Sequence, residues 1–259
     1  METPQGHKRK GLVCACEFLG QIFFMYAVMV SGATKSDFAG LVGPLALFSV
    51  ASIFGGISGG HFNPAVTLGV YIREGHYAKN FLFMVMIIAS QVSGALVGMM
   101  LGYMVLRIDV DGTLIVPKQS VPLLLPSCIT TDDIDNNTIK YGEEFTTFYM
   151  EVICTFVFVL FILFVSGKHG GGSVWGLPAI CIVLWALCSV DFYTGASFNP
   201  ALAIAQSVFQ AWWYPTNHSN VMYHYLPHYV GGALTGGLIS GAFYNIYEKH
   251  VLDVMALER

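Results

Sequence analysis

The sequence predicts an all-α membrane protein in which six spanning helices and two re-entrant half-helices form an inverted repeat. Three observations support this fold class: the composition, the lengths of the apolar runs and a motif that occurs twice. Of the 259 residues, 55% are apolar and 11% are charged, against about 25% charged in an average soluble domain. The net charge of −4 provides no basic surface for nucleic acid.

Six apolar stretches have about the length needed to cross a bilayer. They lie near residues 12–31, 40–57, 81–106, 145–166, 174–193 and 225–247. The first stretch resembles a signal peptide, but its end offers only a weak cleavage site and five more spans follow, so we interpret it as a retained helix. Eight of the 12 Lys and Arg residues lie on the side of the N-terminus. This bias predicts that both termini are in the cytoplasm or its equivalent.

The two halves of the chain repeat each other on either side of a long polar segment. Glu17 corresponds to Glu151 and Asn63 to Asn199, at offsets of 134 and 136 positions. Since each half holds three spans, an odd number, the second half enters the membrane from the opposite side. We therefore expect a single membrane domain over 1–259, with a first repeat at 1–106, an outer loop at 107–144 and a second repeat at 145–259.

Glycine recurs every four residues in the third and sixth spans. The third span holds Gly94, Gly98 and Gly102, and the sixth holds Gly232 and Gly236. Small residues at this spacing let membrane helices approach closely. Both spans are therefore predicted to make close helix contacts.

The motif Asn-Pro-Ala occurs once in each half, at Asn63-Pro64-Ala65 and at Asn199-Pro200-Ala201. Asn is a strong N-cap and Pro is favoured at the first helical position, so each motif predicts a helix start. The runs at 63–72 and 199–210 are about ten residues long and would cover about 15 Å as helix, half of the hydrocarbon thickness. Each half-helix can enter the membrane without crossing it, and inverted topology brings the two starts together near its centre.

Irregular backbone at the membrane centre is tolerated only inside protein or beside a wet cavity, so the two helix starts predict a pore. The side-chain amides of Asn63 and Asn199 would donate into it, and each helix N-terminus carries about +0.5 charge. Water or a neutral hydroxyl-bearing solute can accept from both amides. Two half-charges about 5 Å away raise the energy of a cation by about 3 kcal/mol. The pattern predicts a passive pore for neutral molecules that excludes ions and protons.

The segments around both motifs resemble the two signature loops of the aquaporin, or major intrinsic protein, family. The resemblance rests on residues 58–67, 194–201 and 16–20 and covers almost the whole chain, except 107–144 and the tails. It implies a right-handed bundle of six tilted helices plus the half-helices, assembled in the lipid bilayer as a homotetramer with one pore in each subunit. It implies a channel for water or small neutral solutes such as glycerol, urea, ammonia or hydrogen peroxide. No cofactor and no metal site are expected.

The sequence departs from this family at the outer selectivity filter. Relatives usually carry Arg directly after the second Asn-Pro-Ala, where this chain has Leu202. The resemblance places the other filter positions at Ala196, near Leu187, and near Gly43 or Pro44. These residues supply no side-chain donor, so we expect a wider, more apolar gate that selects less strongly for water.

Other classes of function receive less support. The alternative to a channel is a scaffold subunit with its pore closed by apolar side chains inside a larger membrane assembly, which an open pore one water wide would contradict. No Gly-rich phosphate loop, HExxH or GxSxG motif suggests an enzyme. An ion-coupled carrier would be expected to hold more intramembrane charge than Glu17, Glu151 and Asp191.

Glu17 and Glu151 are carboxylates within apolar spans, which by default suggest function, including a proton relay. Their symmetry favours a role in which each accepts hydrogen bonds from one re-entrant loop and holds its half-helix. His61, beside Asn63, is expected to hydrogen-bond within its loop, since no second ligand lies near it at metal spacing.

Two further features are read from short patterns. Relatives often react with mercury through a cysteine three residues before the second Asn, a position that Ala196 occupies here. No block is expected through that site, and Cys188 is the nearby thiol. Asn136 and Asn217 match the glycosylation acceptor pattern on the predicted outer side.

Overall fold

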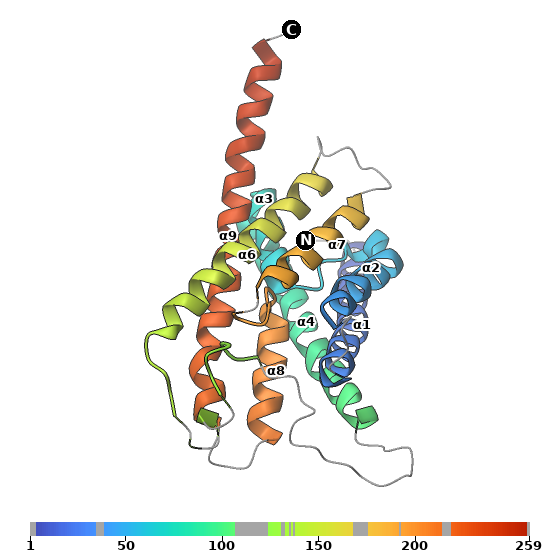
Figure 1. Ribbon diagram of the computed structural model, residues 1–259. Helices are drawn as coiled ribbons and strands as arrows, with labels where there is room; N and C mark the ends of the chain where they lie inside the picture. Colours follow the sequence, from blue (N-terminus) through green and yellow to red (C-terminus); the bar gives the residue numbers. More distant parts are fainter. Residues whose placement is uncertain are drawn as a thin grey trace.

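The computed structural model describes residues 4–34, 39–106, 124–130, 133–134, 136, 138–167, 176–191, 193–213 and 219–257. Over these residues the fold is all-helical. The helices are α1 (Pro4–Thr34), α2 (Ala39–Ser58), α3 (Pro64–Glu74), α4 (Tyr77–Leu106), α6 (Glu143–Ser166), α7 (Gly176–Val190), α8 (Pro200–Trp213) and α9 (Ser219–Leu257). Figure 1 shows them as one bundle, with α3 and α8 in its upper and lower parts and the end of α9 projecting beyond the other helices.

All six predicted spans coincide with helices. Among the described residues, α1, α2, α4 and α6 contain segments long and apolar enough to cross a membrane, and α7 is a shorter apolar helix. The sixth span, α9, is less apolar because Gly, Tyr and His occupy much of it. Most helices run past the predicted spans, since apolar length marks only the hydrocarbon layer, whereas helical hydrogen bonding continues into the interface.

Glycine places helix backbones in direct contact, as the four-residue spacing predicts. A Cβ on Gly98 of α4 would lie 2.4 Å from the carbonyl oxygen of Ile22 in α1. A Cβ on Gly236 of α9 would lie 2.6 Å from the carbonyl oxygen of Val152 in α6. The two halves therefore pack their first and third spans in the same way, which is the form of helix contact that small residues permit in membranes.

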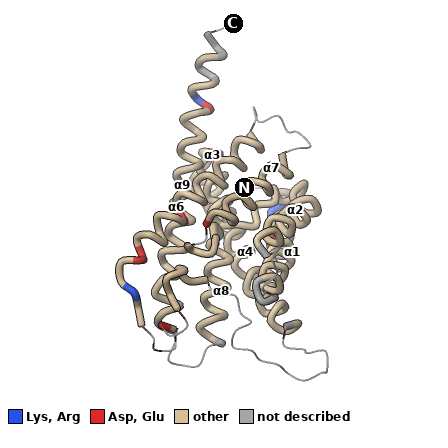
Figure 2. Tube along the Cα trace, in the orientation of Figure 1, with Lys and Arg blue, Asp and Glu red and all other residues tan. Residues whose placement is uncertain are grey.

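The outward surface of the bundle is apolar. Ile53, Leu82, Ile182 and Ile246 are each more than 60% exposed, and Figure 2 shows few charged residues along the tube. An apolar surface of this extent is unfavourable in water and suits the acyl chains of a bilayer. The helices thus bury their polar groups towards the centre of the bundle.

Part of the predicted outer loop packs into the bundle. Leu124, Leu125 and Ile134 are buried in the hydrophobic core, and the backbone N–H of Ser127 donates to the carbonyl oxygen of Tyr193 at 2.8 Å. This part of the long polar segment therefore contributes to the core, because its few leucines and isoleucines pack at an apolar site. Residues 107–123 lie outside the described residues.

Of the two predicted glycosylation acceptors, Asn136 is exposed. Asn217 lies outside the described residues.

Candidate functional site

The two Asn-Pro-Ala motifs start α3 and α8 as the capping pattern predicts. Asn63 has extended backbone, and its Oδ1 accepts from the backbone N–H of Ala65 at 2.8 Å. In the second half, Oδ1 of Asn199 accepts from the backbone N–H of Ala201 at 3.0 Å. Pro follows each Asn at the first helical position, where its missing N–H leaves no gap in the hydrogen bonding.

The two loops are tied to each other through the same asparagines. Nδ2 of Asn63 donates to the carbonyl oxygen of Phe198 at 2.8 Å, and Nδ2 of Asn199 donates to the carbonyl oxygen of Phe62 at 2.9 Å. A side-chain amide carries two hydrogens. Each Asn therefore uses one hydrogen to hold the opposite loop and keeps a second. The two half-helices meet tip to tip at the centre of the bundle.

Phe62 and Phe198 have a backbone conformation that L-residues rarely adopt. Their φ angles are +43° and +46°, in the left-handed region, which costs a non-glycine residue about 1–2 kcal/mol. This conformation turns each carbonyl towards the opposite Asn. The strain must therefore be offset by the hydrogen bonds around the loop.

Glu17 holds the first loop from the inside of α1. Its Oε1 accepts from the Ser58 hydroxyl at 2.7 Å and from the His61 backbone N–H at 3.0 Å. Its Oε2 accepts from the Phe62 backbone N–H at 2.7 Å and from Nε2 of Gln91 at 2.8 Å. The carboxylate is fully buried and each oxygen has two donors, which compensates its removal from water.

Glu151 makes the corresponding contacts in the second half. Its Oε1 accepts from the Thr194 hydroxyl at 3.0 Å and from the Ser197 backbone N–H at 3.2 Å. Its Oε2 accepts from the Phe198 backbone N–H at 2.8 Å. Both carboxylates therefore accept backbone and hydroxyl hydrogen bonds from the re-entrant loop of their own half.

His61 contacts its own half-helix. Its Nδ1 lies 3.2 Å from Oγ1 of Thr67, and Thr67 in turn accepts from Nε2 of Gln91 at 2.9 Å. In the second half, the hydroxyl of Tyr229 donates to the carbonyl oxygen of Thr194 at 2.8 Å. Sequence reasoning missed Gln91 and Tyr229 as loop partners. They are 138 positions apart, the offset that also relates Gly94 to Gly232, so the repeat could have revealed them.

Among the described residues, three adjacent cavities lie around the meeting point of the half-helices. The narrow cavity has about 30 Å³ and is lined by residues that include Asn63 and Asn199. The basic cavity, of about 620 Å³, includes His61 and Arg73 and lies on the side where α1 begins. The apolar cavity, of about 300 Å³, includes Leu202 and lies on the opposite side. Because one water needs about 10–15 Å³, the narrow cavity has room for a water.

Three of the four expected filter residues line the apolar cavity: Gly43, Ala196 and Leu202. Pro44, the other candidate near Gly43, also lines it. The fourth position was expected near Leu187. Its neighbour Cys188 lines the cavity together with Leu184, one helical turn away on the same face of α7, whereas Leu187 is not among the lining residues that are described.

The apolar cavity also differs from expectation in its other lining residues. Leu124, from the outer loop, forms part of the wall. The polar side chains of Ser31, Asp191 and Gln206 line it as well, so the gate is less uniformly apolar than the four filter positions imply. No Lys or Arg is among the lining residues within the part of the chain that is described.

This fold and site define a class of integral membrane protein in which two half-helices, inserted from opposite sides of a helical bundle, meet at paired asparagines. Residues 7–244 match the family described as Major intrinsic protein, and the chain belongs to that family.

Relatives and a solved structure agree with this assignment. The chain is 30% identical over 197 residues to Glycerol uptake facilitator protein-like 6 of Lactiplantibacillus plantarum, covering 74% of this chain and 82% of the relative. It is 28% identical over 248 residues to Aquaporin C of Dictyostelium discoideum, covering 89% and 78%. It is 30% identical over 245 residues to Aquaporin-4 of Dipodomys merriami, covering 88% of this chain but 65% of that protein. The X-ray structure of the aquaglyceroporin from Plasmodium falciparum has the same fold, with a TM-score of 0.71 at 20% identity, covering 95% of this chain and 99% of that one.

Proposed function

We propose that this protein is a passive channel for water and small neutral solutes, and that its path runs through the basic, narrow and apolar cavities. One observation carries the proposal: Asn63 and Asn199 line a cavity with room for a water, and each has a second amide hydrogen to offer. The relatives that are named as aquaporins and as a glycerol uptake facilitator support this class of solute.

Charge exclusion in this proposal arises at the narrow cavity. Both half-helices point their N-termini towards it, and two half-charges disfavour a cation there while leaving a neutral molecule unaffected. Donation from both amides also orients a passing water, which interrupts a chain of hydrogen bonds along which a proton would move. Glu17 and Glu151 serve the same function indirectly, because they hold the loops that position the amides.

The filter in this proposal is formed by Gly43, Ala196, Leu184 and Leu202 around the apolar cavity. Without an arginine at this gate, a solute meets mainly carbon atoms. A gate of this kind admits glycerol alongside water. The guanidinium group that relatives usually carry is absent, so it neither narrows the gate nor binds the hydroxyl groups of the solute there.

The protein is further proposed to assemble as a homotetramer with both termini in the cytoplasm or its equivalent. The excess of Lys and Arg on the side where α1 begins supports the orientation. The apolar outward surface can be shared between lipid and neighbouring subunits. A closed scaffold is disfavoured by the room for water at the narrow cavity and by relatives named for transport.

Stopped-flow light scattering on proteoliposomes tests the channel. Wild-type protein is expected to accelerate osmotic water flux and glycerol flux over protein-free vesicles. Gly43→Trp should suppress both, because Gly43 lines the apolar cavity and open space surrounds its Cβ position. Gly11→Trp is the matched control, since Gly11 is exposed on α1 with the same open space. Folded wild-type protein that accelerates neither solute would reject the channel in favour of the scaffold.

A further inference from the structure

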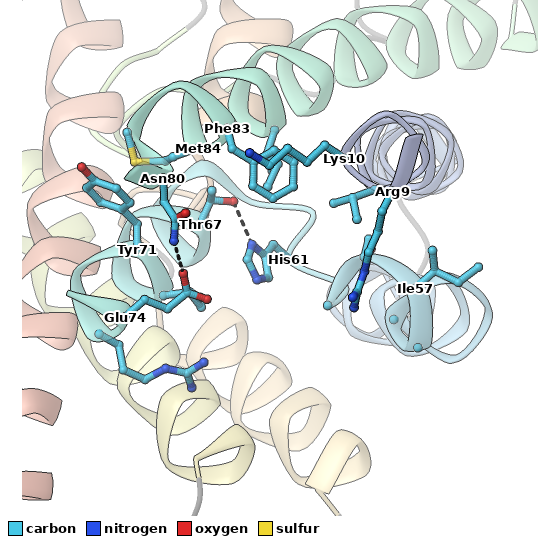
Figure 3. Close-up of a pocket in the computed structure, with 18 of the residues that line it drawn as sticks. Arg9, Lys10, Ile57, His61, Thr67, Tyr71, Glu74, Asn80, Phe83 and Met84 are labelled. Carbon is cyan, nitrogen blue, oxygen red and sulfur yellow. Dashed lines mark hydrogen bonds between the residues drawn. The ribbon is translucent and has the colours of Figure 1, made fainter. Parts of the chain in front are cut away.

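The three cavities along the proposed path differ widely in volume. The basic and apolar cavities have about 620 and 300 Å³, whereas the narrow cavity has about 30 Å³. The narrow cavity shares His61 with the basic cavity and both Phe24 and Leu184 with the apolar cavity. In Figure 3 the basic cavity extends from Arg9 on one flank to Glu74 on the other, with His61 between them. A solute that fits either larger cavity must therefore still pass the smallest space, which lies at the paired asparagines.

Four apolar side chains from four different helices form much of the wall of the narrow cavity. They are Phe24 of α1, Leu47 of α2, Phe158 of α6 and Leu184 of α7, and we call them the apolar collar. Each is at most 7% exposed and belongs to the hydrophobic core. Because protein cores are close-packed, such a side chain cannot yield to a solute without disturbing its neighbours. The collar is therefore a firm boundary.

The collar follows the internal repeat of the chain. Phe24 corresponds to Phe158 at an offset of 134 positions, and Leu47 corresponds to Leu184 at an offset of 137. These offsets are close to those that relate the two glutamates and the two asparagines. Each half of the chain thus contributes one phenylalanine and one leucine to the space where the half-helices meet.

The asparagines and the collar act on different parts of a solute. The second amide hydrogens of Asn63 and Asn199 can be accepted by water or by a hydroxyl oxygen, whereas the collar offers only carbon. The narrow cavity has room for about two or three waters. The carbon atoms of a polyol must therefore pass in contact with the collar. A carbon that fits poorly there is costly, since one methylene in a tight apolar site changes a rate by about tenfold or more.

We propose that the apolar collar, and not the outer filter, determines the largest neutral solute that the protein conducts. Water is expected to pass fastest and glycerol more slowly, while a longer polyol such as erythritol is held back at the collar. The outer filter around the apolar cavity then admits solutes that the collar rejects. This inference rests on the proposed channel function, and it assigns size selection to Phe24, Leu47, Phe158 and Leu184 in particular.

The test enlarges the narrow cavity and leaves the outer filter intact. Phe158 and Leu47 line the narrow cavity and are not among the described residues that line the apolar cavity. Stopped-flow light scattering on proteoliposomes gives the ratio of glycerol to water permeability, which does not depend on how much folded channel is present. Phe158→Ala and Leu47→Ala should each raise this ratio at least about fivefold and add a measurable erythritol flux. Since the two residues lie on separate helices, one variant suffices if the other fails to fold.

Two control variants remove the same side chains elsewhere in the core. Phe209 and Leu163 are buried as deeply, and neither is among the described residues that line a cavity. Phe209→Ala and Leu163→Ala should keep the ratio within about twofold of wild type, because distant sites act independently. Leu202→Ala enlarges the apolar cavity instead and should shift the ratio less than either collar variant.

The possible results separate the collar from the channel. Equal shifts in the collar variants and the core controls would mean general loosening of the bundle and would overturn the inference. A larger shift in Leu202→Ala, or wild-type protein that conducts erythritol as fast as glycerol, would also overturn it. Wild-type water flux with an unchanged ratio in the collar variants would refute the collar alone. Folded wild-type protein without water flux would refute the channel, and the collar with it.

Discussion

Replacing Glu17 or Glu151 by Gln is expected to destabilise the protein through its re-entrant loops. Each carboxylate receives two rigid backbone N–H groups, one on each oxygen. At Glu17 they come from His61 and Phe62 at 3.0 and 2.7 Å, and at Glu151 from Ser197 and Phe198 at 3.2 and 2.8 Å. An amide side chain has a single acceptor oxygen, so its NH₂ group must face the other backbone N–H.

The magnitude follows from that one lost acceptor. A buried N–H without a partner costs about 1–3 kcal/mol, so each single variant should lose about 1–3 kcal/mol of unfolding free energy. The double variant E17Q/E151Q should lose about 2–6 kcal/mol if the two loops act independently. The loss weakens the support of Phe62 and Phe198, whose strained backbone presents the carbonyls to the two asparagines.

Equilibrium unfolding in mixed micelles of dodecyl maltoside and sodium dodecyl sulfate, followed by tryptophan fluorescence, measures these changes. Glu74→Gln is the control: Glu74 is exposed and accepts one hydrogen bond from Asn80, so its loss should stay within about 0.5 kcal/mol. If E17Q unfolded at the wild-type detergent ratio, loop support would be refuted. Unchanged stability together with altered proton flux would favour a proton relay at Glu17.

Three further predictions concern other parts of the bundle. Gly98→Ala should lose about 1–3 kcal/mol in the same titration, because its methyl would lie 2.4 Å from a carbonyl oxygen of α1. Gly56→Ala, with open space at its Cβ position, should lose nothing. A mercurial should react with Cys188, which lines the apolar cavity, and so slow water flux in stopped-flow experiments. If the mercurial inhibited the Cys188→Ala variant as strongly as wild type, this prediction would be contradicted. The ammonium of Lys140 and hydrogen bonds from Thr130 lower the pKa of Asp133 to about 2. Because this value lies below that of the unfolded carboxyl, about 3.9, the pair supports loop docking above pH 4 and loses this effect as pH falls towards 2. Pepsin cleavage of residues 124–142, normalised to an unstructured peptide, should therefore rise between pH 4 and 2 in wild type, and Asp133→Asn should already be susceptible at pH 4.

Some parts of the site follow from local sequence, and others depend on how the helices pack. The starts of α3 and α8 could be predicted because capping by Asn and Pro acts within a few residues. The pairing of Glu17 and Glu151 with the loops could be anticipated because the repeat places both at equivalent depth. The filter position on α7 could be predicted only to within a residue of Leu187, because motif spacing leaves the rotation of this helix uncertain and one residue turns a side chain to another face.

The outer loop shows the same limit. It is a long polar segment, yet Leu124 forms part of the apolar cavity. The hydroxyl of Tyr225 donates to the carbonyl oxygen of Lys140 at 2.9 Å, and Ser127 donates to the backbone of Tyr193. The residues in each of these contacts are distant in the chain, so no local sequence pattern predicts the contacts.

Apolar length, helix capping and internal symmetry, which are properties of short segments, allowed the sequence alone to determine the spanning helices, the paired half-helices and the inverted order of the two halves. The tertiary structure decided which side chains share a cavity: Leu184 and Cys188 at one mouth, and Arg9, Lys10 and Arg73 at the other. The physical reason is that helix rotation and loop docking are set by contacts between residues tens of positions apart, and such contacts exist only once the bundle has packed.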